Sequence, residues 1–186
     1  EKSLKLIDEL DPKKKYIVVV AQEDGTIEEP NSGDLYSYGT LANVLKVFDM
    51  PDSSKSAIVQ GISRVKILDY TNSEPYFKAA IQLVDDEPIE DDLEVEALAN
   101  NLRQSFADLM NVAPNLTEEH TGMLSNIQKP NRLTDRAISL LTVPNKEKQE
   151  VLEELNIKVR VEKAINLISR EIQRIKLGEE IQSEVH

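Results

Sequence analysis

The feature that most restricts the fold is a pair of apolar segments separated by a short polar turn. The segments are residues 41–48 and 57–68, and the intervening residues 51–54 read Pro-Asp-Ser-Ser. Residues that favour strands on both sides of a turn cluster predict an antiparallel β-hairpin. Gly61 lies inside the second segment, where a glycine often marks a β-bulge or a close backbone approach. We therefore expect a hairpin that is irregular at Gly61.

The side-chain phase of the second segment is expected to change around this glycine. Before Gly61, Val59 is predicted to face inward. After it, Val65 and Ile67 share one face of the strand, and Arg64 takes the other. We expect Gly61 and Arg64 to serve the framework, with Arg64 closing an ion pair with one of the many acidic residues.

Three shorter segments complete the predicted β-rich part. Residues 2–10 have apolar side chains at helical spacing and predict a short helix. Residues 16–21 are a continuous apolar run, which predicts a strand buried on both faces. Residues 76–83 alternate and predict another strand, after a turn at 70–75. Its predicted core face consists of Phe77, Ala79, Ile81 and Leu83.

The composition changes at Asp85, where the acidic stretch 85–92 begins. It lacks the ligand spacing and the glycine of a calcium loop, so we expect a solvated linker. After it, the apolar period becomes helical. We therefore predict two domains, a β-rich part at 1–86 and an α-helical part at 87–186.

Four helices are predicted in the first part of this helical region. They are expected at 92–112, at 117–127 with Thr117 as N-cap, around Leu133 up to Pro144, and after Asn145 as a further N-cap. The apolar face predicted for the first of these helices consists of Leu93, Ala97, Leu102, Phe106, Leu109 and Met110.

The last helix is expected to be the longest and to start at Ile157. Apolar side chains recur along it at alternating spacings of four and three, which predicts a narrow seam. The seam consists of Val161, Ile165, Ile168, Ile172 and Ile175. It can pack on its own bundle or on a neighbouring chain, and we favour its own bundle.

The residue types leave little room for catalysis in this chain. There is no cysteine, which excludes disulfides and thiolate metal sites. The only histidines, His120 and His186, are far apart, and we expect a solvent-facing His120 and no metal centre or Ser-His-Asp set. The glycines are isolated, so neither a P-loop nor a dinucleotide fingerprint is present. We expect no catalytic residue and no cofactor in this piece.

Charge and hydropathy also exclude classes of partner. The formal net charge of −12 disfavours binding to a nucleic-acid backbone or an anionic membrane, since both would repel the chain. No apolar run approaches the ~20 residues of a membrane span. The chain begins at Glu1 rather than at methionine, and we expect it to be a piece of a longer protein.

What remains is recognition through the surface. Apolar side chains lie beside or within the turn-rich segments around the hairpin, where packing is less certain to bury them. The candidate contact residues are Tyr36, Tyr38, Leu41, Phe48 and Met50. The alternative for each is ordinary core or loop packing, whereas the functional interpretation is an exposed apolar patch that binds a partner.

An ordered set of short motifs resembles the amino-terminal, substrate-binding domain of ATP-dependent Lon protease. Each motif is weak alone, but their order spans essentially the whole chain. The motifs are Glu1-Lys2-Ser3-Leu4, Val20-Ala21-Gln22, Leu35-Tyr36, Gly39-Thr40-Leu41-Ala42, Pro51-Asp52, and Val59-Gln60-Gly61 with Arg64. The chain departs from the family pattern before Glu1, where the opening strand of the family is absent.

The resemblance implies an α+β fold, in which a small β-rich pseudo-barrel of the PUA-like type precedes an α-helical bundle with a long C-terminal helix. It implies a domain that captures damaged or selected regulatory proteins and supports a homo-hexamer. The ATP, the Mg²⁺ and the Ser-Lys dyad of such a protease belong to modules outside this chain. The resemblance also implies a cytoplasmic protein.

Two other functions remain as alternatives. One is a stand-alone Lon-like β domain that acts as an adaptor or binds a small ligand, as in the cereblon branch of the fold. The zinc-binding cysteines of that branch are absent. The other is a hydrolase with a Ser-Lys pair, for which no sequence context singles out a serine.

Overall fold

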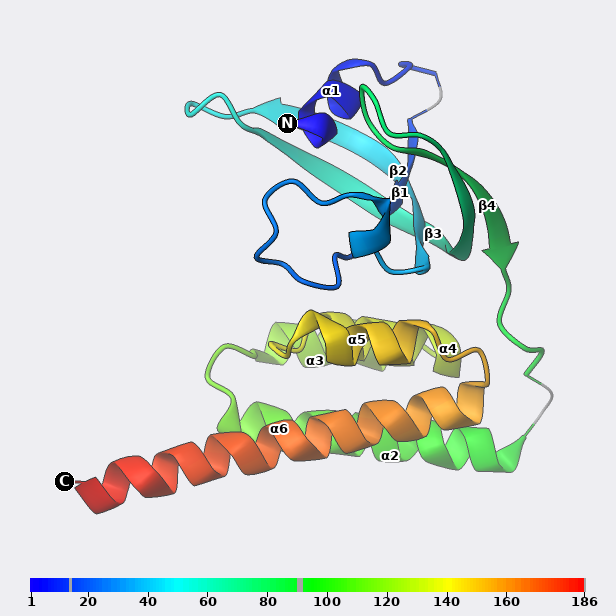
Figure 1. Ribbon diagram of the computed structural model, residues 1–186. Helices are drawn as coiled ribbons and strands as arrows, with labels where there is room; N and C mark the ends of the chain where they lie inside the picture. The colour runs from blue at the N-terminus through cyan, green and yellow to red at the C-terminus, as the bar shows by residue number, and fades with distance from the viewer. Residues whose placement is uncertain (14, 90–91, 186) are drawn as a thin grey trace. The chain divides into compact units, whose positions relative to one another are not determined.

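The structure is a computed structural model that describes residues 1–13, 15–89 and 92–185. The chain divides into two compact units, Glu1–Asp85 and Asp86–His186 (Figure 1). Strands dominate the first unit and helices form the second, which confirms the α+β class. Glu90 and Asp91 of the predicted acidic linker, and His186, lie outside the described residues.

The first unit is built on one four-stranded antiparallel sheet in the order β1-β2-β3-β4. Its strands are β1 (Tyr16–Val19), β2 (Tyr38–Asp49), β3 (Lys55–Asn72) and β4 (Lys78–Val84). Two short helices accompany them, α1 (Lys2–Asp8) and the 3-10 helix η1 (Ser32–Asp34). The predicted turn at 70–75 starts later than expected, because β3 pairs with β4 as far as Asn72.

The predicted hairpin is confirmed, and it contains two β-bulges. β2 and β3 pair from Tyr38–Lys66 to Asp49–Lys55. The register skips Ile62 in β3, next to Gly61, and Leu45 in β2. The predicted irregularity at Gly61 is therefore present, whereas the bulge at Leu45 is not marked by a glycine in the sequence.

The turn that closes the hairpin is held by its own polar groups. The backbone N–H of Met50 donates to the carbonyl of Ser54 at 2.9 Å. The Asp52 carboxylate accepts from the Ser54 N–H at 3.0 Å, as aspartate commonly does two residues upstream in a turn. Ser53 takes a positive φ of 67° between them.

Three burial predictions for the sheet are wrong. Val59 and Leu83 are exposed, and so are Tyr16 and Val19 at the two ends of β1. β1 and β4 each pair with one neighbour only, and only small helices belong to this unit. The buried apolar core of the first unit is correspondingly small and is formed by Ala42, Val44 and Val65.

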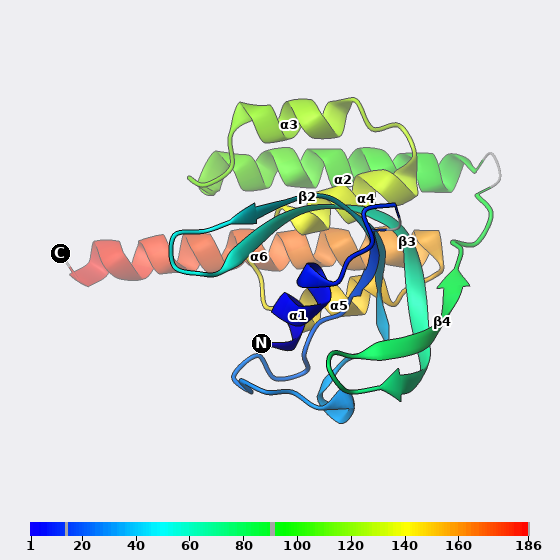
Figure 2. The ribbon, with the colours of Figure 1, turned by 90° about the horizontal axis from the view of Figure 1, so that it is seen from above.

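The second unit contains the five predicted helices (Figure 2). They are α2 (Leu93–Val112), α3 (Glu118–Ser125), α4 (Pro130–Ser139), α5 (Asn145–Leu152) and α6 (Ile157–Val185). Asp92 caps α2 by accepting from the Glu94 N–H at 2.9 Å. Asn145 is not the cap of α5 as predicted, because that position is held by Pro144.

The buried face of α2 begins later than predicted. Its buried residues are Val95, Ala99, Leu102, Phe106 and Leu109, at alternating spacings of four and three. The predicted members Leu93 and Ala97 are exposed. Leu93 directly follows the N-cap, where the stripe that faces the bundle has not yet started.

The seam of α6 packs on its own bundle, as favoured from the sequence. Val161 and Ile168 are fully buried, and the three other seam residues are half-buried against the same core. The C-terminal part of α6 extends beyond α2 (Figures 1 and 2). The apolar side chains of this overhang are exposed and are Leu177, Ile181 and Val185.

Candidate functional site

None of the described strands pairs with the outer half of the hairpin on either side. β1 pairs with β2 only from Thr40 to Asn43, and β4 pairs with β3 only from Arg64 onward. Residues 45–62 therefore continue as a two-stranded ribbon beyond the four-stranded part of the sheet (Figure 1). We refer to residues 45–62 as the hairpin arm.

The hairpin arm concentrates exposed apolar side chains. Six large apolar residues on it are between 38% and 52% exposed. They are Leu45, Phe48, Met50, Ile58, Val59 and Ile62. Two of the six, Leu45 and Ile62, are the extra residues of the two bulges. These exposed apolar side chains make the hairpin arm a candidate binding surface.

The register places these side chains on both faces of the arm. Lys46 lies opposite Ile58, and Phe48 lies opposite Ser56 on the same face. The ammonium of Lys46 is 4.8 Å from the centroid of the Phe48 ring, a cation–π contact that leaves much of the ring accessible. Val59 pairs with Val44 and lies on the other face.

The structure divides the five predicted contact residues into two groups. Phe48 and Met50 are exposed on the hairpin arm. Tyr36, Tyr38 and Leu41 are half-buried near the start of β2. Four further exposed residues of the arm are not predicted as candidates from the sequence: Leu45, Ile58, Val59 and Ile62. The available signal was length, since the second predicted hairpin segment, 57–68, is longer than the predicted strands at 16–21 and 76–83.

A shallow hollow of about 320 Å³ lies between the η1 region and the C-terminal part of β3. Tyr36 and Tyr70 are among its lining residues. The Tyr70 hydroxyl is buried and has no hydrogen-bond partner among the described residues, and burial raises the pKa of this phenol. The Tyr70 ring packs edge-to-face on Phe77, with centroids 5.6 Å apart. We therefore assign Tyr70 a structural role in the first unit.

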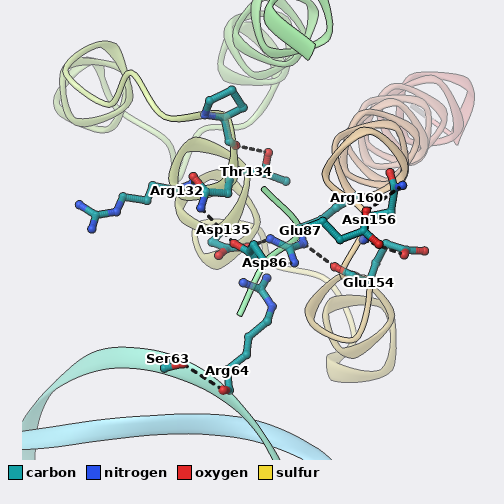
Figure 3. A network of polar contacts seen from close by, with 12 residues as sticks. Ser63, Arg64, Asp86, Glu87, Arg132, Thr134, Asp135, Glu154, Asn156 and Arg160 are labelled. Carbon is teal, nitrogen blue, oxygen red and sulfur yellow. Dashed lines mark hydrogen bonds and ion pairs between the residues drawn. The ribbon is translucent and has the colours of Figure 1, made fainter. Parts of the chain in front are cut away.

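The second unit contains a buried polar cluster around Arg160 (Figure 3). The fully buried Arg160 guanidinium donates to the Asp86 carboxylate at 2.6 Å and to the Glu154 carbonyl at 2.6 Å. The Asn131 side chain donates to the other oxygen of Asp86 at 3.0 Å. These contacts fasten the start of the unit to α4 and α6, so the cluster is structural.

Arg160 was not singled out from the sequence, although a signal for it exists. It falls on the buried stripe of α6, three residues after Ile157 and four before Ala164. A charged residue in such a position requires a buried partner, because an unpaired charge is costly in an apolar interior. The pattern does not reveal that the partner is Asp86.

His120 is half-buried rather than solvent-facing as predicted. Its Nδ1 accepts the backbone N–H of Thr117 at 2.9 Å, which completes a capping box at the start of α3. In residues 1–13, 15–89 and 92–185, no group of three His, Asp or Glu side chains is arranged to hold a metal ion.

No helix in the described part of the chain is both long enough and apolar enough to cross a bilayer.

Comparison of the sequence with known families gives one match that covers most of the chain. The profile of the ATP-dependent protease La (LON) substrate-binding domain matches residues 1–170. The Lon protease of Anaeromyxobacter dehalogenans is 36% identical over 185 residues, and that of Koribacter versatilis is 35% identical over 186 residues. Both alignments cover 100% of this chain, which spans 22% and 23% of these relatives, respectively.

Solved structures with the same fold carry similar descriptions. The N-terminal domain of the Mycobacterium avium complex Lon protease has a TM-score of 0.62, at 20% identity, over 82% of this chain and 90% of that one. A Lon N-terminal domain protein from Xanthomonas campestris has a TM-score of 0.57, at 15% identity, over 88% of this chain and 82% of that one. At these identities the likeness concerns the fold.

Proposed function

The chain belongs to the family of Lon substrate-binding domains, and from this membership we propose that its hairpin arm captures unfolded protein segments. The observation that carries the proposal is the set of exposed apolar side chains on the arm. Unfolded proteins expose the apolar residues that folded proteins bury. An apolar surface therefore binds unfolded proteins in preference to folded ones, without requiring a particular sequence.

Two of the predicted contact residues, Phe48 and Met50, lie on this surface. Methionine is unbranched and adapts to irregular partners, which suits a surface that must accept many sequences. We include Tyr36, Tyr38 and Leu41 in the proposal as the inner limit of the surface, near the start of β2. All five of these side chains are uncharged, so they do not require a partner of a particular charge.

The proposal extends to a protein as long as the relatives, of which this chain spans 22% and 23%. We propose that it is an ATP-dependent Ser-Lys endopeptidase that acts as a cytoplasmic homo-hexamer and degrades misfolded and selected regulatory proteins. ATP and Mg²⁺ would be bound by its ATPase module. The names of the relatives support this proposal. The role of the present chain would then be to supply substrate and to support assembly.

The test is binding of a permanently unfolded protein to residues 1–186. Reduced, carboxymethylated lactalbumin is the probe, and the Kd is measured by fluorescence anisotropy. Combining Phe48→Ser with Met50→Ser is expected to weaken binding by about tenfold or more, since each side chain contributes on the order of 1 kcal/mol of apolar burial.

Leu83→Ser is the matched control. Leu83 is as exposed as the residues on the arm but lies on β4. This variant is expected to retain the wild-type Kd. No measurable binding by the wild type, or equal losses in the arm variant and in Leu83→Ser, would refute the proposed surface.

A further inference from the structure

The outer edge of β3 in the hairpin arm is an unpaired strand edge. β4 covers β3 only from Arg64, so the segment Ser56–Gly61 has β2 on one side and no named strand on the other. Every residue of this segment is exposed. Six residues at about 3.4 Å each give an edge of about 20 Å, the length of an ordinary strand.

This edge lacks most of the features that usually protect an exposed strand. Natural edges are commonly blocked by lysine, proline or inward-pointing charges, because unpaired N–H and C=O groups recruit other chains. Residues 56–63 read Ser-Ala-Ile-Val-Gln-Gly-Ile-Ser and contain neither a charge nor a proline. In the whole chain, 30% of the residues are charged. The protecting feature that is present, the bulge at Ile62, limits the edge at its far end.

The side chains beside this edge also suit an added strand. Ile58 faces one side of the arm, together with Phe48, and Val59 faces the other. A strand placed along the edge would therefore find an apolar neighbour on both of its faces. Cross-strand apolar pairs of this kind stabilise a sheet, whereas the backbone hydrogen bonds do not depend on the sequence of the added strand.

We propose that an extended segment of an unfolded polypeptide pairs with the Ser56–Gly61 edge of β3 as an additional strand. The inference rests on the proposed function and specifies how the substrate is held. Its occupant is an uncharged, apolar stretch of about six residues. A charged residue in the paired region would lose hydration without finding an opposite charge on residues 56–61.

The first experiment separates backbone pairing from apolar contact in the ligand. A synthetic apolar 12-residue peptide is compared with the same peptide N-methylated at two consecutive central residues. The side chains are identical, but the methyl groups remove one N–H from each edge of the peptide strand. Only one of these two N–H groups faces β3, and strand pairing predicts binding weaker by about fivefold when its hydrogen bond is lost, which corresponds to about 1 kcal/mol.

The second experiment changes the edge in the protein. Gln60→Lys places a charge on the β3 edge, and Gln82→Lys makes the same change on β4, where the original glutamine is also exposed. Only the first is expected to weaken binding of the unmodified peptide, by about tenfold. Amide hydrogen exchange of wild-type residues 1–186 then locates the contact. Alternate amides within 56–61 should gain protection when the peptide is bound.

The outcomes distinguish this inference from the proposed function. If the wild type does not bind the unfolded protein, the proposed function is wrong, and the inference is wrong with it. If it binds but the N-methylated peptide binds equally well and no amide in 56–61 gains protection, the apolar surface stands and strand pairing is refuted. Protection of 56–61 without any peptide, in a dimer of this chain, would refute the proposed occupant in favour of a second copy.

Discussion

Arg160 and Asp86 are 74 residues apart in the sequence, yet the buried guanidinium donates to the Asp86 carboxylate at 2.6 Å (Figure 3). Asp86 is the first residue of the helical unit, and Arg160 lies in the buried stripe of α6. The pair therefore anchors the beginning of the unit to its last helix. Its importance comes less from the attraction itself than from what remains when one partner is lost.

Asp86→Ala is expected to lower the free energy of unfolding of the helical unit by about 3 kcal/mol, because the buried Arg160 loses its closest counter-ion and keeps the more distant Asp135, at 3.9 Å. Urea unfolding followed by circular dichroism at 222 nm reports on this unit, which contains the long helices. Glu87→Ala is the matched control, because Glu87 is exposed and its bond to Asn156 is long, at 3.2 Å. The control is expected to stay within about 0.5 kcal/mol of wild type. Equal losses in the two variants would contradict the assignment.

Gly39 is needed because β1 passes close to it. A Cβ at this position would lie 2.5 Å from the Val19 carbonyl oxygen, which belongs to the backbone and cannot move independently. Gly39→Ala is therefore expected to destabilise the first unit by about 2 kcal/mol. All five tyrosines lie in this unit, so urea unfolding followed by tyrosine fluorescence measures it selectively.

Gly25→Ala is the control for the same change of residue type. No atom lies within 4 Å of a Cβ built there, and this glycine has no positive φ. The substitution is expected to be neutral or stabilising by about 0.5 kcal/mol. A neutral Gly39→Ala would show that β1 can withdraw from β2 without cost.

Structural features that depend on residues close together in the sequence are predicted from it. The Pro51–Ser54 turn predicts the hairpin, Gly61 predicts one bulge, and Thr117 predicts the start of α3. Burial is less predictable because it depends on which elements cover a strand. Val59 has the apolar character of a core residue, yet it is exposed, whereas its cross-strand partner Val44 is buried.

The same limit applies to the candidate site. Phe48 and Met50 were predicted because they lie beside a turn, which is local information. Leu45 was not, because its exposure results from a bulge that no glycine or proline marks. An ion-pair partner that is distant in the sequence cannot be predicted either, as the pair of Asp86 and Arg160 shows. The exposed surface and the open edge both exist because β1 and β4 flank only part of the hairpin. The extent of that pairing is a property of the whole sheet.

Tyr70→Phe is expected to stabilise the first unit by about 0.5–1 kcal/mol. The Tyr70 hydroxyl is buried without a hydrogen-bond partner among the described residues, so its removal relieves an unsatisfied polar group and keeps the ring contact with Phe77. Tyr76→Phe is the control, because the Tyr76 hydroxyl is hydrogen-bonded to Glu9. It is expected to be neutral or slightly destabilising. Fluorescence of the remaining tyrosines in urea measures both, and a destabilised Tyr70→Phe would indicate that the hydroxyl has a partner.

Asp92 gives the stability of the helical unit a defined pH dependence. Its carboxylate caps α2 and lies 2.6 Å from the Lys158 ammonium, and the hydrogen bond from Lys158 holds the pKa of Asp92 below its ordinary value of 3.8. Because the folded pKa is the lower one, the pair contributes stability when the pH is above the ordinary value. The contribution is lost as the pH falls through the lowered pKa.

Asp92→Asn tests this directly, because the amide oxygen can still cap α2 whereas the charge is gone. The wild type is expected to be more stable than the variant from about pH 6 down to about pH 5, with the difference shrinking below about pH 4 as Asp92 is protonated. Urea unfolding at each pH, followed at 222 nm, gives the difference between the two proteins and cancels the other carboxylates. A difference that stays constant down to about pH 2 would mean that the variant has lost the cap rather than the ion pair, since only the ion pair with Lys158 depends on ionisation of Asp92.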